Sequence, residues 1–117
     1  MKLPNVENAV VPEAKIVDYL LSETHFDGRH KAAFFKRFGF TAENWRELAD
    51  ALMRHVDEHD VAKEEPSPFG KRFVVEGIMD TPDGRAPGVR TVWFLRSEET
   101  ICQFVTAYPL KRRARKE

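Results

Sequence analysis

The spacing of apolar residues changes its period near the middle of this chain. In the first half they recur at three- or four-residue intervals, as at Leu48, Leu52 and Val56, which is the pattern of one helical face. After the turn-forming segment at 66–70, β-branched and aromatic residues gather in short runs separated by Gly, Pro and Asp, as is typical of strands. Helices followed by strands predict an α+β fold, with about three N-terminal helices packed on a C-terminal antiparallel sheet of about three or four strands.

Cap residues mark where the expected helices begin and end. Pro12 suits the first position of a helix, because its missing N–H needs no partner there. Gly39 suits the left-handed residue that ends a helix, and Thr41 suits an N-cap. The expected helices span residues 12–22, 28–38 and 41–59.

A short connection joins the last two expected strands. The four residues between Arg96 and Ile101 have the length of a hairpin loop. A simple hairpin pairs Thr91 with Thr106 and puts both hydroxyls, with Tyr108, on one face of the sheet. The expected strands span 61–65, 71–79, 89–95 and 101–108, residues 1–110 are expected to form one domain, and the basic segment 111–117 is expected to be a disordered tail.

The charges balance overall but are segregated along the chain. The 19 basic and 19 acidic residues give no net charge, which argues against a protein that coats nucleic acid. Residues 47–65 hold seven acids and two bases, whereas residues 85–117 hold eight bases and three acids. A local basic surface can bind an anion, although an acidic solvated helix and a basic tail explain the same pattern.

Several classes of site are disfavoured by what the sequence lacks. No apolar run is long enough for a membrane span, and the N-terminal residues do not form a secretion signal, so we expect a cytoplasmic protein. Cys102 is the single cysteine, which disfavours an internal disulfide or a thiol cluster. His55 and His59 lie four residues apart, but no third ligand accompanies them. We therefore expect no metal and no cofactor.

The segment GRHKAAFF, at residues 28–35, is the best clue to a ligand site. At helical spacing Lys31 falls in the middle of the apolar stripe that Phe35 continues, His30 falls on its flank, and Arg29 points away. Lys31 must therefore extend along the edge of the core into solvent or point into a cleft. The first alternative makes the cluster a solvated helix end.

The start of this helix has the properties of an anion site. Helix N-termini expose unpaired N–H groups, and Gly28 removes a side chain where a ligand would approach. Together with Lys31, these groups favour a phosphate or a carboxylate. In the alternative interpretation, Asp27 caps the helix and balances the positive charge.

The order LPN, GRHKAAFFKRFGF, VRTVWFL and FVTAYP resembles a family of small uncharacterised bacterial domains. Its members look like stand-alone proteins or the C-terminal module of polymorphic toxins. The resemblance covers most of residues 3–109 and is carried best by the segments at 28–35, 89–93 and 105–109. The order of helices and sheet is also similar to metal-independent ribonucleases of the barnase, EndoU, colicin and RelE-like type, at the level of fold.

The resemblance implies that the same three segments form a ribonuclease site. Such a site needs a base for the 2′-hydroxyl, an acid for the leaving oxygen, and cations for the phosphate charge. His30 would act as base or acid, because histidine titrates near neutrality. The predicted catalytic residues are His30, Lys31, Arg90, Thr106 and Tyr108, the predicted phosphate-binding residues are Gly28, Arg29, Lys31, Arg90 and Thr91, and the predicted partner is RNA.

Two other functions fit the same sequence. A non-catalytic binding or regulatory module, such as an immunity-type protein with a protein partner, would explain the neutral charge. A dimeric structural domain would use an apolar sheet face around Trp93 as its interface. The ribonuclease hypothesis differs from both because it requires His30, Lys31, Arg90 and Tyr108 to converge on one open cleft.

Overall fold

The helices precede the sheet, as the α+β prediction requires. The computed structural model describes residues 1–26 and 29–110. A short 3-10 turn, η1 (Val6–Asn8), precedes α1 (Glu13–Lys15), which continues into the π-helical turn η2 (Ile16–Leu20); α2 (Arg29–Arg37) and α3 (Trp45–Glu58) follow. The strands β1 (Val61–Ser67), β2 (Gly70–Ile78), β3 (Gly88–Arg96) and β4 (Gln103–Pro109) form one antiparallel sheet in the order β1-β2-β3-β4.

The element bounds differ from the predicted ones mainly at the start of α3. The prediction that Thr41 caps this helix is wrong, because the N-cap is Asn44. The Thr41 hydroxyl instead accepts a hydrogen bond from the Asn44 N–H at 3.2 Å, which closes a turn ahead of the helix. The first helix ends two residues early, at Leu20, and the expected strand at 61–65 is present as β1. The predicted tail at 111–117 lies outside the described residues.

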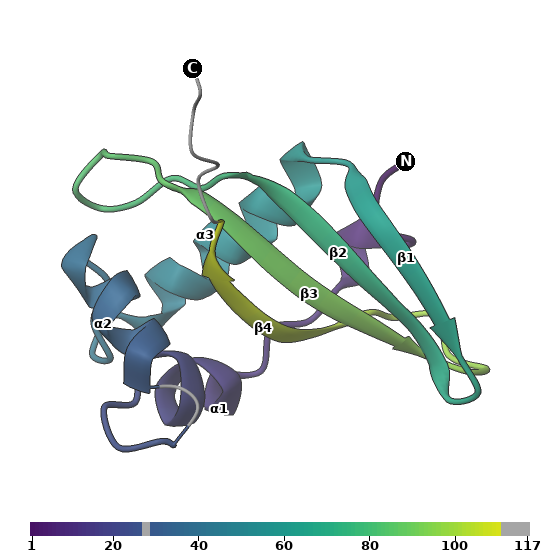
Figure 1. The fold of residues 1–117 in the computed structure, drawn as a ribbon, viewed down its shortest axis with the longest axis horizontal. Coiled ribbons are helices and arrows are strands. Elements are labelled where there is room, and N and C mark those ends of the chain that lie inside the picture. The colour runs from purple at the N-terminus through teal and green to yellow at the C-terminus, as the bar shows by residue number, and fades with distance from the viewer. Residues whose placement is uncertain (27–28, 111–117) are drawn as a thin grey trace, which may run out of the picture.

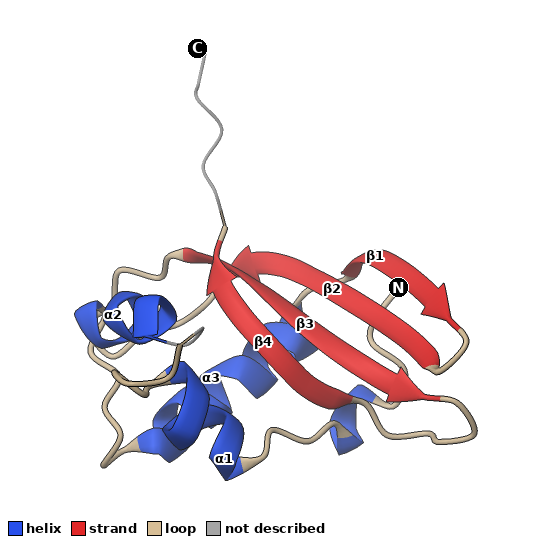
Figure 2. Cartoon of the chain, turned by 60° about the horizontal axis from the view of Figure 1, so that its bottom comes forward, coloured by secondary structure: helices blue, strands red, loops and turns tan. Residues whose placement is uncertain are grey.

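The core lies between α3 and one face of the sheet. Figures 1 and 2 show α3 crossing behind the sheet, with α1 and α2 beside β4. Leu48, Leu52 and Val56 of α3 are fully buried, and so are Val75 and Trp93 on the strands that face them. Burying one such side chain contributes about 1.5–3 kcal/mol, so the amphipathic faces seen in the sequence account for how the layers pack.

A β-bulge in β4 changes the predicted register. Trp93 pairs with Phe104, but Val92 pairs with Thr106, so Val105 is an extra residue in β4. The predicted pairing of Thr91 with Thr106 is therefore wrong.

Thr91 pairs instead with Ala107, and Arg90 pairs with Tyr108. Because neighbouring strand residues point to opposite faces, the bulge puts Thr106 and Tyr108 on the face opposite Phe104. They share this face with Arg90. We call it the outer face, because no described helix covers it (Figure 2).

Candidate functional site

Arg90 occupies the middle of a row of three side chains on the outer face. The register places it between Glu76 on β2 and Tyr108 on β4. Its Nε donates a hydrogen bond to Glu76 Oε2 at 2.6 Å, and its guanidinium carbon lies 5.6 Å from the centre of the Tyr108 ring. The Tyr108 side chain and the Glu76 carboxylate raise the pKa of Arg90 above its ordinary value. The guanidinium is thus a permanent, oriented cation.

Lys31 reaches the same face from the first turn of α2. Its side chain is half-buried, and Nζ lies 5.5 Å from the ring centre of Tyr19 and 6.0 Å from that of Tyr108. The Tyr19 hydroxyl is 2.9 Å from the Thr106 hydroxyl, which joins η2 to β4. An ammonium group within about 6 Å of a ring centre is attracted by the ring's negative face, which holds Lys31 at this place.

Two cations and three hydroxyls therefore converge where α2, η2, β3 and β4 meet. We call this group the tyrosine–cation cluster; its members are Tyr19, Lys31, Arg90, Thr106 and Tyr108. Positive charge beside hydroxyl donors is a suitable environment for a phosphate group. The placement brings together four of the residues predicted from sequence, namely Lys31, Arg90, Thr106 and Tyr108.

A cavity opens on the outer face beside this cluster. It has a volume of about 280 Å³, and Arg90 and Tyr108 line it together with Lys63, Glu65 and Arg72. Glu65 is paired with Lys63 at 3.1 Å and with Arg72, and these two cations lower the pKa of the carboxyl. Each carboxylate in the cavity wall therefore has a cationic partner.

The other predicted residues of the GRHK segment make no hydrogen bond, ion pair or ring contact with the cluster, or lie outside the described residues. His30 is exposed, and its ring makes no hydrogen bond or ring contact within residues 1–26 and 29–110. Its assignment as acid or base stays a prediction. Arg29 is exposed and stacks its guanidinium over the Phe26 ring at 5.5 Å. Gly28, the predicted phosphate-binding glycine, and Asp27, the predicted cap, lie outside the described residues.

Thr91 does not face the cluster. Its side chain is fully buried on the core side of the sheet, and its hydroxyl accepts a hydrogen bond from Trp93 Nε1 at 2.9 Å. The resemblance implied that Thr91 binds phosphate, but neighbouring residues of β3 point to opposite faces, so Thr91 lies on the buried face while Arg90 lies on the outer face. Thr91 therefore belongs to the core.

Three residues in or beside the cluster had no signal in the sequence that marked them as site residues. Tyr19 lay in the first expected helix, at 12–22, and Glu76 lay in the expected strand at 71–79. His25 packs its ring edge against Tyr19, with 4.9 Å between ring centres. A tyrosine and a carboxylate become visible as site residues only when the strand register and helix packing place them beside Lys31 and Arg90.

His55 of α3, one of the two histidines that lie four residues apart, is part of the core. His55 is 1% exposed and places Nε2 within 3.1 Å of the Gly77 carbonyl and 3.0 Å of the Val89 carbonyl. Both partners are acceptors, so Nε2 carries a proton and donates. Across residues 1–26 and 29–110, no three His, Cys, Asp or Glu side chains group to hold a metal.

Cys102 is a buried, unpaired thiol. Burial raises its pKa to about 11, so at neutral pH it stays protonated and is a poor nucleophile.

Within residues 1–26 and 29–110, no helix has the length and hydropathy needed to cross a membrane.

Comparison with known proteins gives a family for the chain. Residues 2–111 match the family model described as "Domain of unknown function (DUF6883)". The chain belongs to this family. No curated protein matches the sequence.

The fold also occurs in a solved structure. It is similar to a chain of a contact-dependent growth inhibition toxin–immunity protein complex from Klebsiella pneumoniae 342. The TM-score is 0.70 at 17% sequence identity, and the match covers 92% of this chain and 97% of that chain. At this identity the likeness establishes a shared fold for this DUF6883 domain.

Proposed function

We propose that this DUF6883 domain is a metal-independent ribonuclease of the toxin type, with the tyrosine–cation cluster as its catalytic site. The observation that carries the proposal is the convergence of Lys31 and Arg90 with the hydroxyls of Tyr19, Thr106 and Tyr108 on an open sheet face. The fold shared with a toxin–immunity complex supports an association with toxins.

The chemistry follows from the charges on the cluster. Lys31 and Arg90 would offset the negative charge that grows on the phosphate oxygens as the 2′-oxygen attacks phosphorus. Tyr108 lies beside both cations and would donate a proton to the leaving 5′-oxygen. Tyr19 and Thr106, bonded to each other, would orient a phosphate oxygen.

Two residues are candidates for the base that accepts the 2′-hydroxyl proton. His30 follows from the sequence, because histidine titrates near neutrality. Glu76 follows from the structure, because Arg90 holds its carboxylate in the same row of side chains. Comparing His30→Ala with Glu76→Gln separates the two candidates.

The test is cleavage of labelled single-stranded RNA in the presence of EDTA. Wild-type protein should cut, and Lys31→Ala and Tyr108→Phe should each slow cutting by roughly a hundredfold or more. Lys36→Ala is the matched control, because Lys36 lies on the same helix but pairs with Glu23 at 2.7 Å. It should cut like wild type.

Two results would contradict the assignment. Repurified wild-type protein that leaves RNA intact at every pH would favour the other hypothesis, a non-catalytic immunity-like module that binds a protein. RNA cutting that is as fast in Lys31→Ala as in Lys36→Ala would place the activity elsewhere or in a contaminant.

A further inference from the structure

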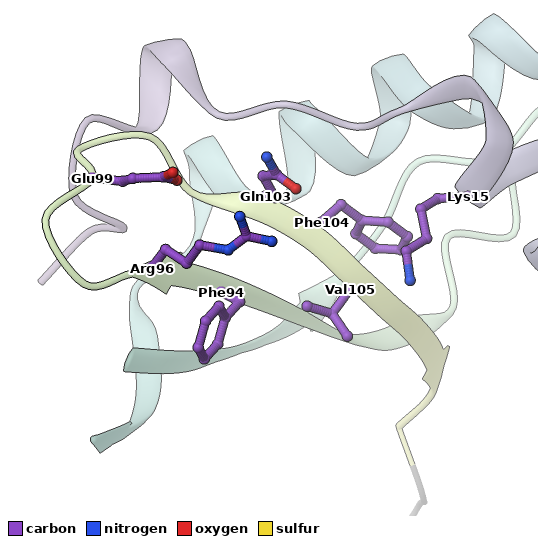
Figure 3. Close-up of a pocket in the computed structure, with 7 residues that line it drawn as sticks. All are labelled: Lys15, Phe94, Arg96, Glu99, Gln103, Phe104 and Val105. Atoms are coloured by element: carbon purple, nitrogen blue, oxygen red, sulfur yellow. The ribbon is translucent and has the colours of Figure 1, made fainter. Parts of the chain in front are cut away.

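A second cavity lies farther along β3 and β4. Its volume is about 350 Å³, and Figure 3 shows the side chains that line it, among them Lys15, Phe94, Arg96 and Gln103. The fold itself does not account for this combination of cations, an amide and an aromatic ring around an open space. The cavity is separate from the one beside Arg90, with which it shares no lining residue.

This cavity begins where the tyrosine–cation cluster ends. Val105, in its wall, directly precedes Thr106 of the cluster. Phe94 lies two residues beyond Val92, the partner of Thr106, which corresponds to a step of about 7 Å along β3. Lys15 connects the two places, because its Nζ lies 5.3 Å from the ring centre of Tyr19.

The lining groups suit a nucleobase. Phe94 is half-buried and has an aromatic ring on which a base can stack. Gln103 offers an amide donor and acceptor, Arg96 offers donors, and Glu99 offers an acceptor, so the edge of a base can be hydrogen-bonded. Figure 3 shows the Arg96 guanidinium pointing across the cavity between Phe94 and Gln103.

We propose that this cavity binds the nucleobase next to the phosphate that the cluster holds, in single-stranded RNA. The inference rests on the proposed function, because the position of the base is defined relative to the phosphate that the cluster would bind. Lys15 would contact the phosphate between the two places. The cavity thus defines the direction in which the RNA strand crosses the outer face, from Arg90 toward Phe94.

The test uses a 2′-O-methyl oligonucleotide, which binds without being cut, and measures its dissociation constant by fluorescence anisotropy. Phe94→Leu keeps the apolar volume but loses the ring, and should weaken binding about 5- to 150-fold, the range reported for one stacked base. Phe69→Leu is the control, since Phe69 is 76% exposed in the turn between β1 and β2. It should bind like wild type.

A matched change in the ligand identifies the contact as a base contact. A set of oligonucleotides, each with a single abasic position at a different place, is compared with the intact oligonucleotide. At one position, base removal should weaken binding to wild type but not to Phe94→Leu, because the same interaction is then removed twice. If Phe94→Leu fails to fold, Arg96→Gln replaces it, because Arg96 is exposed and its substitution leaves the core intact. Arg96→Gln should bind the intact oligonucleotide more weakly than wild type does.

The outcomes separate this proposal from the proposed function. Cutting that depends on Lys31 while Phe94→Leu and Arg96→Gln bind like wild type would overturn the base cavity and leave the ribonuclease. Phe94-dependent binding by a protein that never cuts RNA would support the cavity and overturn the ribonuclease. An oligonucleotide that does not bind at all would overturn the cavity.

Discussion

At the scale of single residues, His55 shows how burial decides the state of a titratable group. Its ring is 1% exposed and donates to two backbone carbonyls from β2 and β3. Burial lowers the pKa of His55 below its usual value, and the neighbouring His59 lowers it further. The neutral ring therefore holds α3 to the sheet. A charged ring at this buried place would cost more free energy than the neutral ring.

The pH dependence of folding stability follows from that shift. In the unfolded chain a histidine takes up a proton near pH 6.5, whereas folded His55 resists it to lower pH. Its contribution to the free energy of unfolding is complete above about pH 6.5 and is lost as the pH falls below that value toward the lowered pKa of folded His55. Urea titrations from about pH 7 to about pH 5 should show this loss, and His55→Gln should flatten it.

A second histidine supplies the control for that measurement. His30→Gln changes an exposed side chain and should keep the wild-type loss of stability below about pH 6.5. If His55→Gln folds and loses stability with pH as steeply as wild type, His55 is not the group responsible.

At the scale of elements, the bulge in β4 and the docking of the first two helices build the cluster. Without Val105 as an extra residue, Thr106 and Tyr108 would share the buried face with Phe104. The bulge turns them outward, where Tyr19 and Lys31 approach from the helical side. One inserted residue thus decides whether the hydroxyls point to the core or to the outer face.

The packing of α3 on the sheet gives a stability prediction at the same scale. Leu52 is fully buried in the middle of this helix. Leu52→Ala should lower the free energy of unfolding by about 2–5 kcal/mol, because it removes buried methyl groups and leaves a cavity. The measurement is a denaturant titration with an unchanged slope. Asp50→Ala, on the exposed face of the helix, should stay within about 0.5 kcal/mol of wild type.

At the scale of the whole molecule, the chain is neutral, and three of its cations, Lys15, Lys31 and Arg90, lie against the two tyrosines of the cluster. The formal net charge is zero, and many surface cations are paired, as Lys36 is with Glu23 and Arg72 with Glu65. Long-range attraction for RNA is therefore weak. In the proposed function, RNA is therefore bound by local contacts with Lys15, Lys31 and Arg90, of which Arg90 is also paired with Glu76.

Salt dependence tests that distribution. Three phosphate contacts to single-stranded RNA predict that the logarithm of the binding constant falls with the logarithm of salt concentration with a slope of about −2. Lys31→Gln should reduce the slope by about 0.7, because one contact is lost. A slope several times steeper for the 2′-O-methyl oligonucleotide would show that a larger basic surface, such as residues 111–117, dominates binding.

The sequence by itself determined the order of helices and strands and much of their extent. It did so because periods of 3.6 and 2 residues record, locally, which face of each element is buried. It also pointed to Lys31, since a lysine in an apolar stripe must reach a boundary of the core. Thr106 and Tyr108 were marked by the expected hairpin and by the resemblance, and Arg90 by the resemblance alone.

Only the tertiary structure decided which of these side chains meet. Thr91 and Thr106 were expected on one face, but the bulge at Val105, which no local pattern announces, put them on opposite faces. Tyr19 joined the cluster, and Glu76 came to lie beside it, through contacts with residues distant in sequence. Strand register and helix docking depend on the packing of the whole core, so a site assembled from four elements is a property of the fold rather than of any one segment.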